Sequence, residues 1–474
     1  MKLSFHGAAR EVTGSCCLLT VNDAEGKERR LLIDCGMFQG ERLCGSKNFE
    51  AFGFDPKTVD AVYVTHPHAD HTGRLPKLVR EGYAGSITMT QPCKALTKIV
   101  LEDAFHIMEE NAKKCGDRVL YGQEDLEALL AQCGGVAYHQ EIAPAPGISV
   151  MFHDAGHVLG SAFISVEAEG KRIVFSGDIG NDDVPILPST EPLSRADVVV
   201  CESTYGHRVH EPPSERSTKL RAALEHILKK KGVLMIPAFS IERTQELLYA
   251  IDQILLYELK TNISIFLDSP MAIRATEVYR HFKEYLDFDA DILLQPDRDF
   301  FSFPNLKETL TVDESRVIND VKAPKIIIAG SGMMSGGRIM HHLIRYLPDK
   351  KNTLLIIGYQ AHGTLGRQIY EGSKQVRIFG KTVPVRAEVA AIGAFSAHGD
   401  MHKLTRWLTP EDGKMPEKIF LVHGDPEAKD VFATHLRHEL RTEVVVPEFQ
   451  STHEIRGLTP LEVSVAKPPT VGSV

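Results

Sequence analysis

A short turn near the start of the chain holds four side chains of the kinds that bind metal ions. In "THPHADH", His66, His68, Asp70 and His71 follow directly after the apolar run "AVYV". Imidazole and carboxylate groups are common zinc ligands, and zinc in proteins is usually four-coordinate. A strand that ends in a tight turn can direct all four side chains into one space, but only around more than one ion. Because a histidine-rich surface turn rarely has this pattern by chance, the stretch predicts a site for two metal ions.

Other candidate ligands stand where further apolar strands are expected to break into glycine-containing turns. They are Asp34 in "LLIDCG", His157 in "HDAGHVLGS", Asp178 in "FSGDIG" and His423 in "FLVHGD". A lone histidine is more often a core or surface residue than a ligand. The shared setting favours a common site, since catalytic groups collect on loops held by rigid strands.

Short β-rich runs alternate with turns over the first two hundred residues. "KLSFHG", "RRLLIDCG" and "RIVFSGD" are examples, and helical patterns such as "QPCKALTKIVLEDAFHIMEENAKK" separate some of them. Several runs alternate polar and apolar residues, as a sheet with one covered face requires. This mixture predicts an α/β sandwich of sheets flanked by helices.

A different pattern begins at about residue 206 and continues to about residue 385. Short, continuously apolar strands now precede amphipathic helices, as in "GVLMIPAF" followed by "SIERTQELLYAIDQILL". Such βαβ units predict a doubly wound domain with a buried parallel sheet. Residues 386–474 then supply further strands and helices, including "KIFLVHGDPEAKDVFATHLRHEL".

Size and composition agree with an ordinary globular protein of two domains. The chain has 474 residues, of which 43% are apolar and 25% are charged. It has no apolar stretch that could span a membrane and no signal peptide, so we expect a cytoplasmic protein. The eight cysteines include no C-x-x-C pair, which argues against a zinc ribbon. A net charge of −9 argues against a protein that coats nucleic acid. It does not argue against a nuclease, because bound divalent cations and a basic cleft can supply positive charge locally.

The candidate ligands together resemble those of the metallo-β-lactamase superfamily. "CESTYG", "FSAHGD" and "FLVHGD" further resemble the three additional motifs of its β-CASP branch of nucleases, and the match extends from "GAAREVTGSC" to "FLVHGD". The resemblance implies an αββα lactamase sandwich formed by residues 1–205 and 386–474, interrupted by a β-CASP domain at 206–385. Because the sequence begins directly with the lactamase motifs, we expect it to lack the N-terminal KH domains of many archaeal relatives. It also stops without the long C-terminal domain of RNase J.

The resemblance also implies a role for each candidate ligand in a site for two zinc ions. The implied ligands are His66, His68 and His157 for one zinc, Asp70, His71 and His423 for the other, and Asp178 bridging both. Asp34 is expected behind the ligands, where a carboxylate orients a ligand histidine and raises its basicity.

A two-metal centre suits the hydrolysis of phosphodiesters, but also that of lactams and thioesters. The inserted domain must therefore indicate the substrate. In "KIIIAGSGMMSGGR", the glycine-rich turn around Ser331, Gly332 and Met333 is expected to bind a substrate phosphate near a helix N-terminus. A plain strand–helix turn is the alternative. The family segments that line the same cleft suggest further phosphate contacts from Arg243, Arg367 and Ser396.

His398 of "FSAHGD" bears on the choice between RNA and DNA. RNA-acting members of the family carry histidine here, whereas the DNA-repair branch typically carries valine. With Glu202 of "CESTYG" as its partner, a protonated His398 would be the general acid for a leaving alkoxide. The expected catalytic residues are therefore Asp178, Glu202 and His398, with a surface histidine as the alternative for His398.

These patterns predict a zinc-dependent ribonuclease, endo- or 5′-exonucleolytic, that resembles the bacterial and archaeal relatives of the polyadenylation-type cleavage endonuclease. Attack of a hydroxide generated at two metals on single-stranded RNA would leave 5′-phosphate and 3′-hydroxyl ends. A homodimer is compatible with the sequence. One alternative is a small-molecule hydrolase of glyoxalase or lactamase type, which needs no inserted domain. Another is a catalytically idle RNA-binding subunit, which would not need every ligand position filled.

Overall fold

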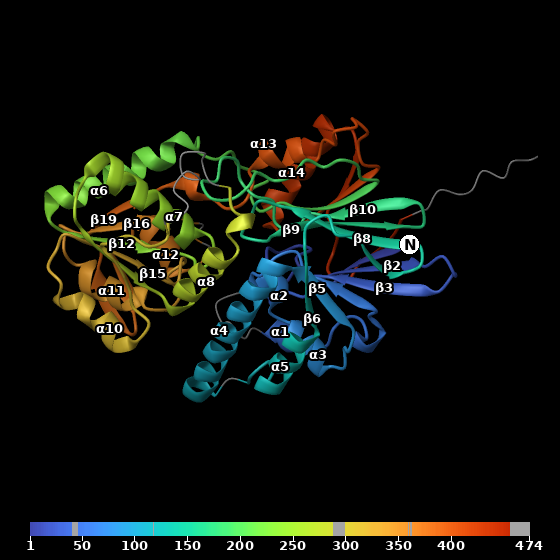
Figure 1. Ribbon diagram of the computed structural model, residues 1–474, viewed down its shortest axis with the longest axis horizontal. Helices are drawn as coiled ribbons and strands as arrows, with labels where there is room; N and C mark the ends of the chain where they lie inside the picture. The colour runs from blue at the N-terminus through green and yellow to red at the C-terminus, as the bar shows by residue number, and fades with distance from the viewer. Residues whose placement is uncertain (40–45, 117, 288–298, 359, 361–362, 456–474) are drawn as a thin grey trace, which may run out of the picture.

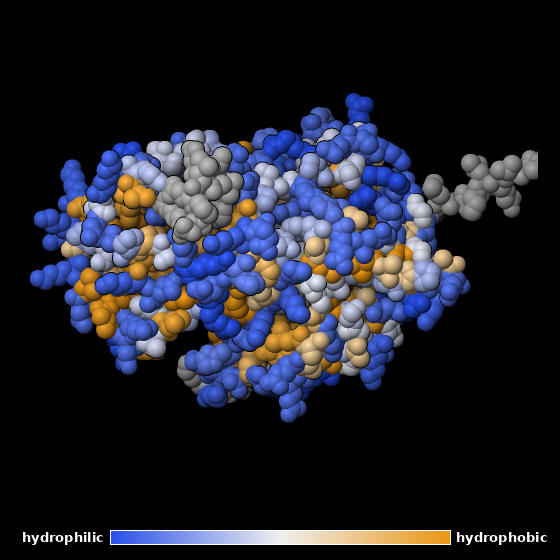
Figure 2. Space-filling model, in the orientation of Figure 1, coloured by the Kyte–Doolittle hydropathy of each residue, from blue (hydrophilic) through white to orange (hydrophobic). Residues whose placement is uncertain are grey.

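Two sheets packed face to face form one part of the molecule, and a third, parallel sheet forms the other (Figure 1). The computed structural model describes residues 1–39, 46–116, 118–287, 299–358, 360 and 363–455. Figure 2 shows a largely hydrophilic face that is hollowed between the inserted domain and helix α4 (Gln91–Cys115). Within the described ranges, no helix is both long enough and apolar enough to cross a membrane.

Each sheet of the sandwich has seven strands. The first sheet has, in spatial order, β22 (Thr452–Glu454), β1 (Lys2–Phe5), β2 (Cys17–Asn22), β3 (Glu28–Ile33), β4 (Ala61–Tyr63), β5 (Ser86–Thr90) and β6 (Cys133–Val136). The second has β21 (Glu443–Val445), β20 (Lys418–Val422), β11 (Val198–Glu202), β10 (Lys171–Phe175), β9 (Ala162–Ala168), β8 (Ile148–Asp154) and β7 (Ile142–Ala145). The last strands of the described residues, β21 and β22, thus lie at the outer edges of the two sheets, and β22 pairs with β1 near the N-terminus.

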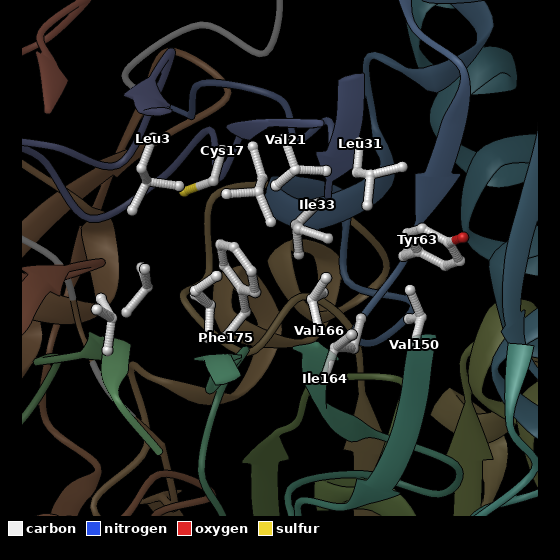
Figure 3. Packing of buried hydrophobic residues seen from close by; sticks show 14 of the residues in the cluster. Leu3, Cys17, Val21, Leu31, Ile33, Tyr63, Val150, Ile164, Val166 and Phe175 are labelled. Atoms are coloured by element: carbon white, nitrogen blue, oxygen red, sulfur yellow. The ribbon is translucent and has the colours of Figure 1, made fainter. Parts of the chain in front are cut away.

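The main core lies between these two sheets (Figure 3). Leu31 and Ile33 of β3 point inward, towards Ile164 and Val166 of β9, whereas Leu32 belongs to the core on the outer face. This alternation follows from the two-residue period of side chains along a strand. Each large apolar side chain buried in this way contributes about 1.5–3 kcal/mol to folding.

Helices cover both outer faces and complete the predicted αββα sandwich. Helices α3 (Leu75–Arg80), α4 (Gln91–Cys115) and α5 (Gln123–Gln132) pack on the first sheet, and α13 (Met401–Trp407) and α14 (Pro426–Glu439) pack on the second. Helix α4 begins after Thr90, whose side chain accepts a hydrogen bond from the Cys93 amide, and it ends at the left-handed Gly116. Two single-turn helices, α1 (Ser46–Phe49) and α2 (Ala69–Thr72), lie in the connections after β3 and β4.

The third sheet belongs to the inserted domain and is parallel throughout. Its order is β14 (Leu306–Glu308), β13 (Ser264–Asp268), β15 (Lys325–Ala329), β12 (Val233–Pro237), β16 (Thr353–Ile356) and β19 (Glu388–Ala391). One face carries α6 (Ser214–Lys230), α7 (Arg243–Gln253) and α8 (Pro270–His281). The other carries α11 (Ile339–Tyr346), α12 (Leu365–Tyr370) and the hairpin of β17 (Gln375–Ile378) and β18 (Lys381–Pro384). Coverage of both faces confirms the predicted doubly wound architecture, and the short helix α10 (Val312–Val317) follows β14.

The sheet of the inserted domain extends beyond residue 385, the limit expected from the sequence. Strand β19 pairs in parallel with β16, from Thr353 opposite Glu388 to Ile356 opposite Ala391. The pattern "EVAAIGAF" could not indicate this, because one short strand followed by a turn fits either domain.

Candidate metal centre

The predicted ligands lie in loops at one edge of the sandwich. Strands β8, β10, β11 and β20 run in the same direction, so their carboxyl ends share this edge. His157, Asp178 and His423 follow three of these ends, and "THPHADH" follows β4 of the facing sheet. Helix α2, within "THPHADH", lies on the side of the sandwich that faces the inserted domain (Figure 1). The fold therefore brings together the motifs that the sequence separates.

Two glycines allow these loops to approach closely. A Cβ atom on Gly36 would stand 1.5 Å from the backbone oxygen of Asp70, and one on Gly180 would stand 2.0 Å from that of Gly156. Any side chain at either position would push one ligand loop away from another. This explains the glycines that follow "LLIDC" and "FSGDI".

His66, His68 and His157 form the first group of donors. His68 Nδ1 lies 3.1 Å from His66 Nε2 and 3.4 Å from His157 Nε2. Asp178 Oδ2 lies 3.3 Å from His66 Nε2 and 3.6 Å from His157 Nε2. Ligand atoms about 2.0–2.1 Å from a tetrahedral zinc ion are about 3.3 Å apart, so these four atoms fit one ion.

Asp70, His71 and His423 form the second group, on the other side of Asp178. His423 Nε2 lies 3.3 Å from Asp70 Oδ2, and His71 Nε2 lies 3.4 Å from Asp178 Oδ1. That Asp178 oxygen is buried and accepts no hydrogen bond from the described residues. A buried carboxylate oxygen without a donor is costly unless a cation neutralises it, so the residues fit a metal ion here as well. Asp178 thus presents one oxygen to each group of donors.

The electrostatics of His66, His68 and Asp178 favour the protonation states that metal binding needs, whereas those of His71 favour a protonated ring. Burial lowers the pKa of His66 to about 3 and that of His68 to about 4, so both rings are neutral at pH 7. Burial opposes ionisation of Asp178, but the surrounding imidazoles, His423 foremost, hold its pKa well below the usual range. Burial likewise opposes protonation of His71, but Asp178 and Asp34 raise its pKa. A metal ion that binds His71 Nε2 would therefore have to displace the proton on that nitrogen.

Asp34 lies directly behind His71, the position expected for a residue that orients a ligand. His71 Nδ1 donates to Asp34 Oδ2 at 2.7 Å, which directs Nε2 towards Asp178. The Thr65 amide and hydroxyl both donate to the same carboxylate at 2.8 Å. The Thr204 hydroxyl lies 3.0 Å from His423 Nδ1 in a similar way. Neither Thr65 nor Thr204 was singled out from the sequence, although Thr65 directly precedes His66 and Thr204 lies within "CESTYG".

Glu202 and His398 form a hydrogen-bonded pair beside the metal ligands. His398 Nδ1 lies 3.1 and 3.2 Å from the two oxygens of Glu202, which is fully buried and also accepts from the Ile179 amide at 2.8 Å. The His398 ring centroid is 4.6 Å from that of His157. Burial opposes the charge on His398, but Glu202 and Asp178 outweigh this effect and raise its pKa to about 9. The surroundings therefore favour the protonated form of an imidazole that lies beside the metal ligands.

The predicted phosphate loop follows the carboxyl end of β15, a central strand of the third sheet. Doubly wound folds commonly bind ligands at the carboxyl ends of their strands. The Ser331 hydroxyl accepts from the Ser335 amide at 3.1 Å, and the Gly332 carbonyl accepts from Gln360 Nε2 at 3.0 Å. The Met333 carbonyl accepts from the Gly366 amide at 3.3 Å. These bonds hold the turn in one shape.

The other three predicted phosphate contacts differ in their surroundings. Arg243 is buried, and its guanidinium pairs with Glu242 and Glu246 rather than reaching the surface. Arg367 of α12 pairs at 2.7 Å with Glu371, the residue that follows this helix, and stays partly exposed. The Ser396 hydroxyl donates to the His398 carbonyl at 3.3 Å, so it belongs to the loop of the candidate acid.

Arg216 is a further residue that the sequence did not single out. Its guanidinium donates to the carbonyls of Ala394, at 2.9 and 3.0 Å, and Asp183, at 2.7 Å. It also lies 3.1 Å from Glu246 Oε1 of the inserted domain. Arg216 therefore links the loops that carry Asp178 and His398 to the second domain.

An αββα sandwich with two groups of histidine and aspartate donors at its loop edge defines a metallo-hydrolase of the lactamase class. Three family profiles match the sequence: the metallo-beta-lactamase superfamily at residues 11–130, the Beta-Casp domain at 244–369, and the Zn-dependent metallo-hydrolase RNA specificity domain at 382–447. The chain belongs to the β-CASP branch of the metallo-β-lactamase superfamily.

Similar proteins span nearly the whole chain. Ribonuclease TTHA0252 of Thermus thermophilus is 40% identical over 90% of this chain and 94% of its own length. The RNase J-like protein of Methanocaldococcus jannaschii is 33% identical over 94% of this chain and 97% of its own length. Transcription termination factor FttA of the same organism is 32% identical over 94% of this chain and 70% of its own length. A solved protein of unknown function from Enterococcus faecalis V583 shares the fold, with a TM-score of 0.53 and 12% identity over 95% of this chain and 99% of that one.

Proposed function

We propose that the protein is a zinc-dependent ribonuclease that hydrolyses phosphodiester bonds of single-stranded RNA at a two-zinc centre. The observation that carries the proposal is the position of Asp178, with one oxygen towards each group of donors and the His398–Glu202 pair beside them. The matching RNA specificity domain and the ribonuclease names of the relatives support RNA as the substrate. The homodimer and the cytoplasmic location stay predictions from the sequence.

Seven side chains would hold the metal ions, in the grouping described above. When bound, two zinc ions supply a water of lowered pKa and neutralise the charge of the phosphate. Asp34 holds the His71 ring in one orientation. Glu202 accepts a hydrogen bond from the Nδ1–H group of His398. The protonated ring can then give the proton on its second nitrogen to the departing 3′-oxygen, which leaves a neutral imidazole.

Cleavage is expected to leave 5′-phosphate and 3′-hydroxyl ends, because water rather than the ribose 2′-hydroxyl is the nucleophile. An RNA oligomer with a single 2′-deoxy nucleotide at the cleaved position should therefore still be cut there. Mass spectrometry of the fragments measures both ends, and thioester and lactam substrates serve as controls that should turn over poorly. A fragment ending in a 2′,3′-cyclic phosphate would contradict this mechanism.

The seven catalytic ligands are expected to hold two zinc ions per chain when the protein is purified without chelators. Mass spectrometry of the intact protein under native conditions measures the ions bound, and dialysis against a chelator should abolish RNA hydrolysis until zinc is restored. The reason is the number of donors, which exceeds what one tetrahedral zinc can use. A catalytic centre that holds a single ion at full activity would argue against the proposal.

The glycine-rich turn is expected to contribute to RNA binding. A Cβ atom on Gly332 would stand 2.7 Å from the Phe239 ring, so Gly332→Val should displace the turn. We expect RNA affinity to fall at least about tenfold, or about 1.4 kcal/mol, with unchanged zinc content. Gly336→Val is the matched control, because a Cβ atom there meets nothing within 4 Å. Equal RNA affinity of both variants and the wild type, measured by fluorescence anisotropy, would exclude the turn from the binding site.

A further inference from the structure

A third group of metal-ligating side chains lies outside the candidate catalytic centre. His139 stands in the turn between β6 and β7, His153 lies in β8, and Glu191 lies in the connection from β10 to β11. One ligand atom from each of these three residues, the His139 cluster, falls within 4.8 Å of the other two. We propose that the His139 cluster binds an additional zinc ion at the surface of the sandwich.

The distances within the His139 cluster suit a single ion. His139 Nε2 lies 3.1 Å from Glu191 Oε1, and His153 Nδ1 lies 3.7 Å from Glu191 Oε2. Two ligands of a tetrahedral zinc ion are about 3.3 Å apart, so small side-chain rotations bring all three donors to bonding distance. Two imidazoles and one carboxylate form the donor set of many protein zinc sites that keep a position open for water.

Neighbouring residues already orient the buried histidine of the cluster. The His153 ring stacks on Phe163, with centroids 4.7 Å apart and an angle of 11° between the planes. Its Nε2 lies 3.0 Å from the Ser165 hydroxyl, which can accept a hydrogen bond and leave Nδ1 as the metal ligand. The Arg172 guanidinium donates to the same Ser165 hydroxyl at 3.4 Å, so its 3.5 Å approach to Nε2 need not be a hydrogen bond and is compatible with this tautomer. The ring is thus held with one nitrogen towards the carboxylate.

The other two ligands leave the site open to solvent. The His139 side chain is 57% exposed, compared with 30% for Glu191 and 10% for His153. Glu191 is anchored to the end of β8, because its amide donates to the Asp154 carbonyl at 3.0 Å and its Oε1 accepts from the Asp154 amide at 3.1 Å. An ion can therefore enter from water without movement of the backbone.

The position of the cluster gives the ion a structural role. Asp154 ends β8 and begins the loop that carries His157, and the neighbouring Thr190 hydroxyl donates to the Ala155 carbonyl at 2.9 Å. An ion that joins β8, the His139 turn and Glu191 would hold the base of this ligand loop in place. The simpler arrangement, in which Glu191 only forms ion pairs with two histidines, would give the same distances without a metal.

Zinc titration distinguishes the two arrangements. Untagged protein is equilibrated with buffered free zinc, and the ions bound per chain are measured for the wild type, His139→Ala, Glu191→Gln and His106→Ala. His106→Ala is the matched control, because His106 forms an exposed pair with Glu110 at 3.3 Å on helix α4. We expect His139→Ala and Glu191→Gln each to bind one ion fewer than the wild type, and His106→Ala to bind the same number.

The comparison of wild type and His139-cluster variants does not depend on the number of ions in the catalytic centre, because only the difference in ions bound per chain is used. His68→Ala, which removes a catalytic ligand, should keep the ion of the His139 cluster, so failure of the proposed function and failure of this site are separable. His153→Ala removes the remaining ligand of the His139 cluster and should also bind one ion fewer than the wild type. Equal zinc binding by the wild type, His139→Ala and Glu191→Gln would overturn the proposal.

Discussion

Replacing Asp178 with asparagine is expected to lower the rate of RNA hydrolysis by more than about 10³-fold. Loss of one hydrogen-bond donor that stabilises a transition state typically costs 10²–10³-fold. Asp178 contributes to both groups of donors, so its loss should weaken the binding of both ions and the water activation that they supply. The asparagine amide keeps the size of the side chain, but it removes the charge and replaces one oxygen with an NH₂ group that does not bind metals.

Asp182→Asn is the matched control for this variant. Asp182 lies four residues further along the same loop, is 41% exposed, and pairs with Lys403 at 2.9 Å. Exposed ion pairs contribute at most about 1 kcal/mol, so this variant should retain nearly the wild-type rate. Initial rates on a fluorescent RNA oligomer and thermal unfolding by circular dichroism are measured for both. An Asp178→Asn protein that is folded and within tenfold of the wild-type rate would exclude the two-metal centre as the site of hydrolysis.

His398→Ala is expected to lower turnover by about 10²–10⁴-fold without loss of zinc, the usual range for a positioned general acid. The 3′-alkoxide is a poor leaving group, and the Glu202 carboxylate holds the imidazole beside the metal ligands. An RNA with a 3′-bridging sulfur at the cleaved position has a leaving group that needs no proton. We expect the variant to recover much of its lost rate on this substrate.

His402→Ala provides the control, because His402 is an exposed histidine on α13 only four residues away. It should match the wild type on both substrates. If His398→Ala is as impaired on the sulfur substrate as on ordinary RNA, relative to the wild type on each, His398 is not the acid. It would then act as a phosphate contact.

The pH dependence gives a second measure of the same residue. A general acid is active while protonated, so raising the pH through its pKa lowers the rate. The neighbouring carboxylates raise the pKa of His398 to about 9 from its ordinary value of 6.5. Zinc ions offset the contribution of Asp178 and leave that of Glu202, so we expect the alkaline decline between these two values. The decline should be absent in His398→Ala, as measured from kcat/KM over pH 6 to 10.

The kinds of elements and the candidate ligands followed from the sequence because both are local properties. Apolar residues at two-residue spacing, or in short continuous runs, identify strands such as β3 and β12 without knowledge of their neighbours. His66, His68, Asp70 and His71 lie within one turn, so their closeness needs no tertiary contact. The shared setting of His157, Asp178 and His423 at strand ends favoured a common site, and the family resemblance supplied their grouping around two ions. The structure brings all three to one edge of the sandwich.

Contacts between distant segments were decided only by the tertiary structure. Residue types alone did not show that Asp178 directs one oxygen to each group of donors, or that Arg243 lies buried between Glu242 and Glu246. Periodicity could not place β19 in the sheet of the inserted domain, because the pairing partner of a short strand is set by packing and not by its own pattern. The His139 cluster joins residues from three separate segments, each ordinary by itself. A site of this kind exists only when β8 and its neighbouring loops have folded together.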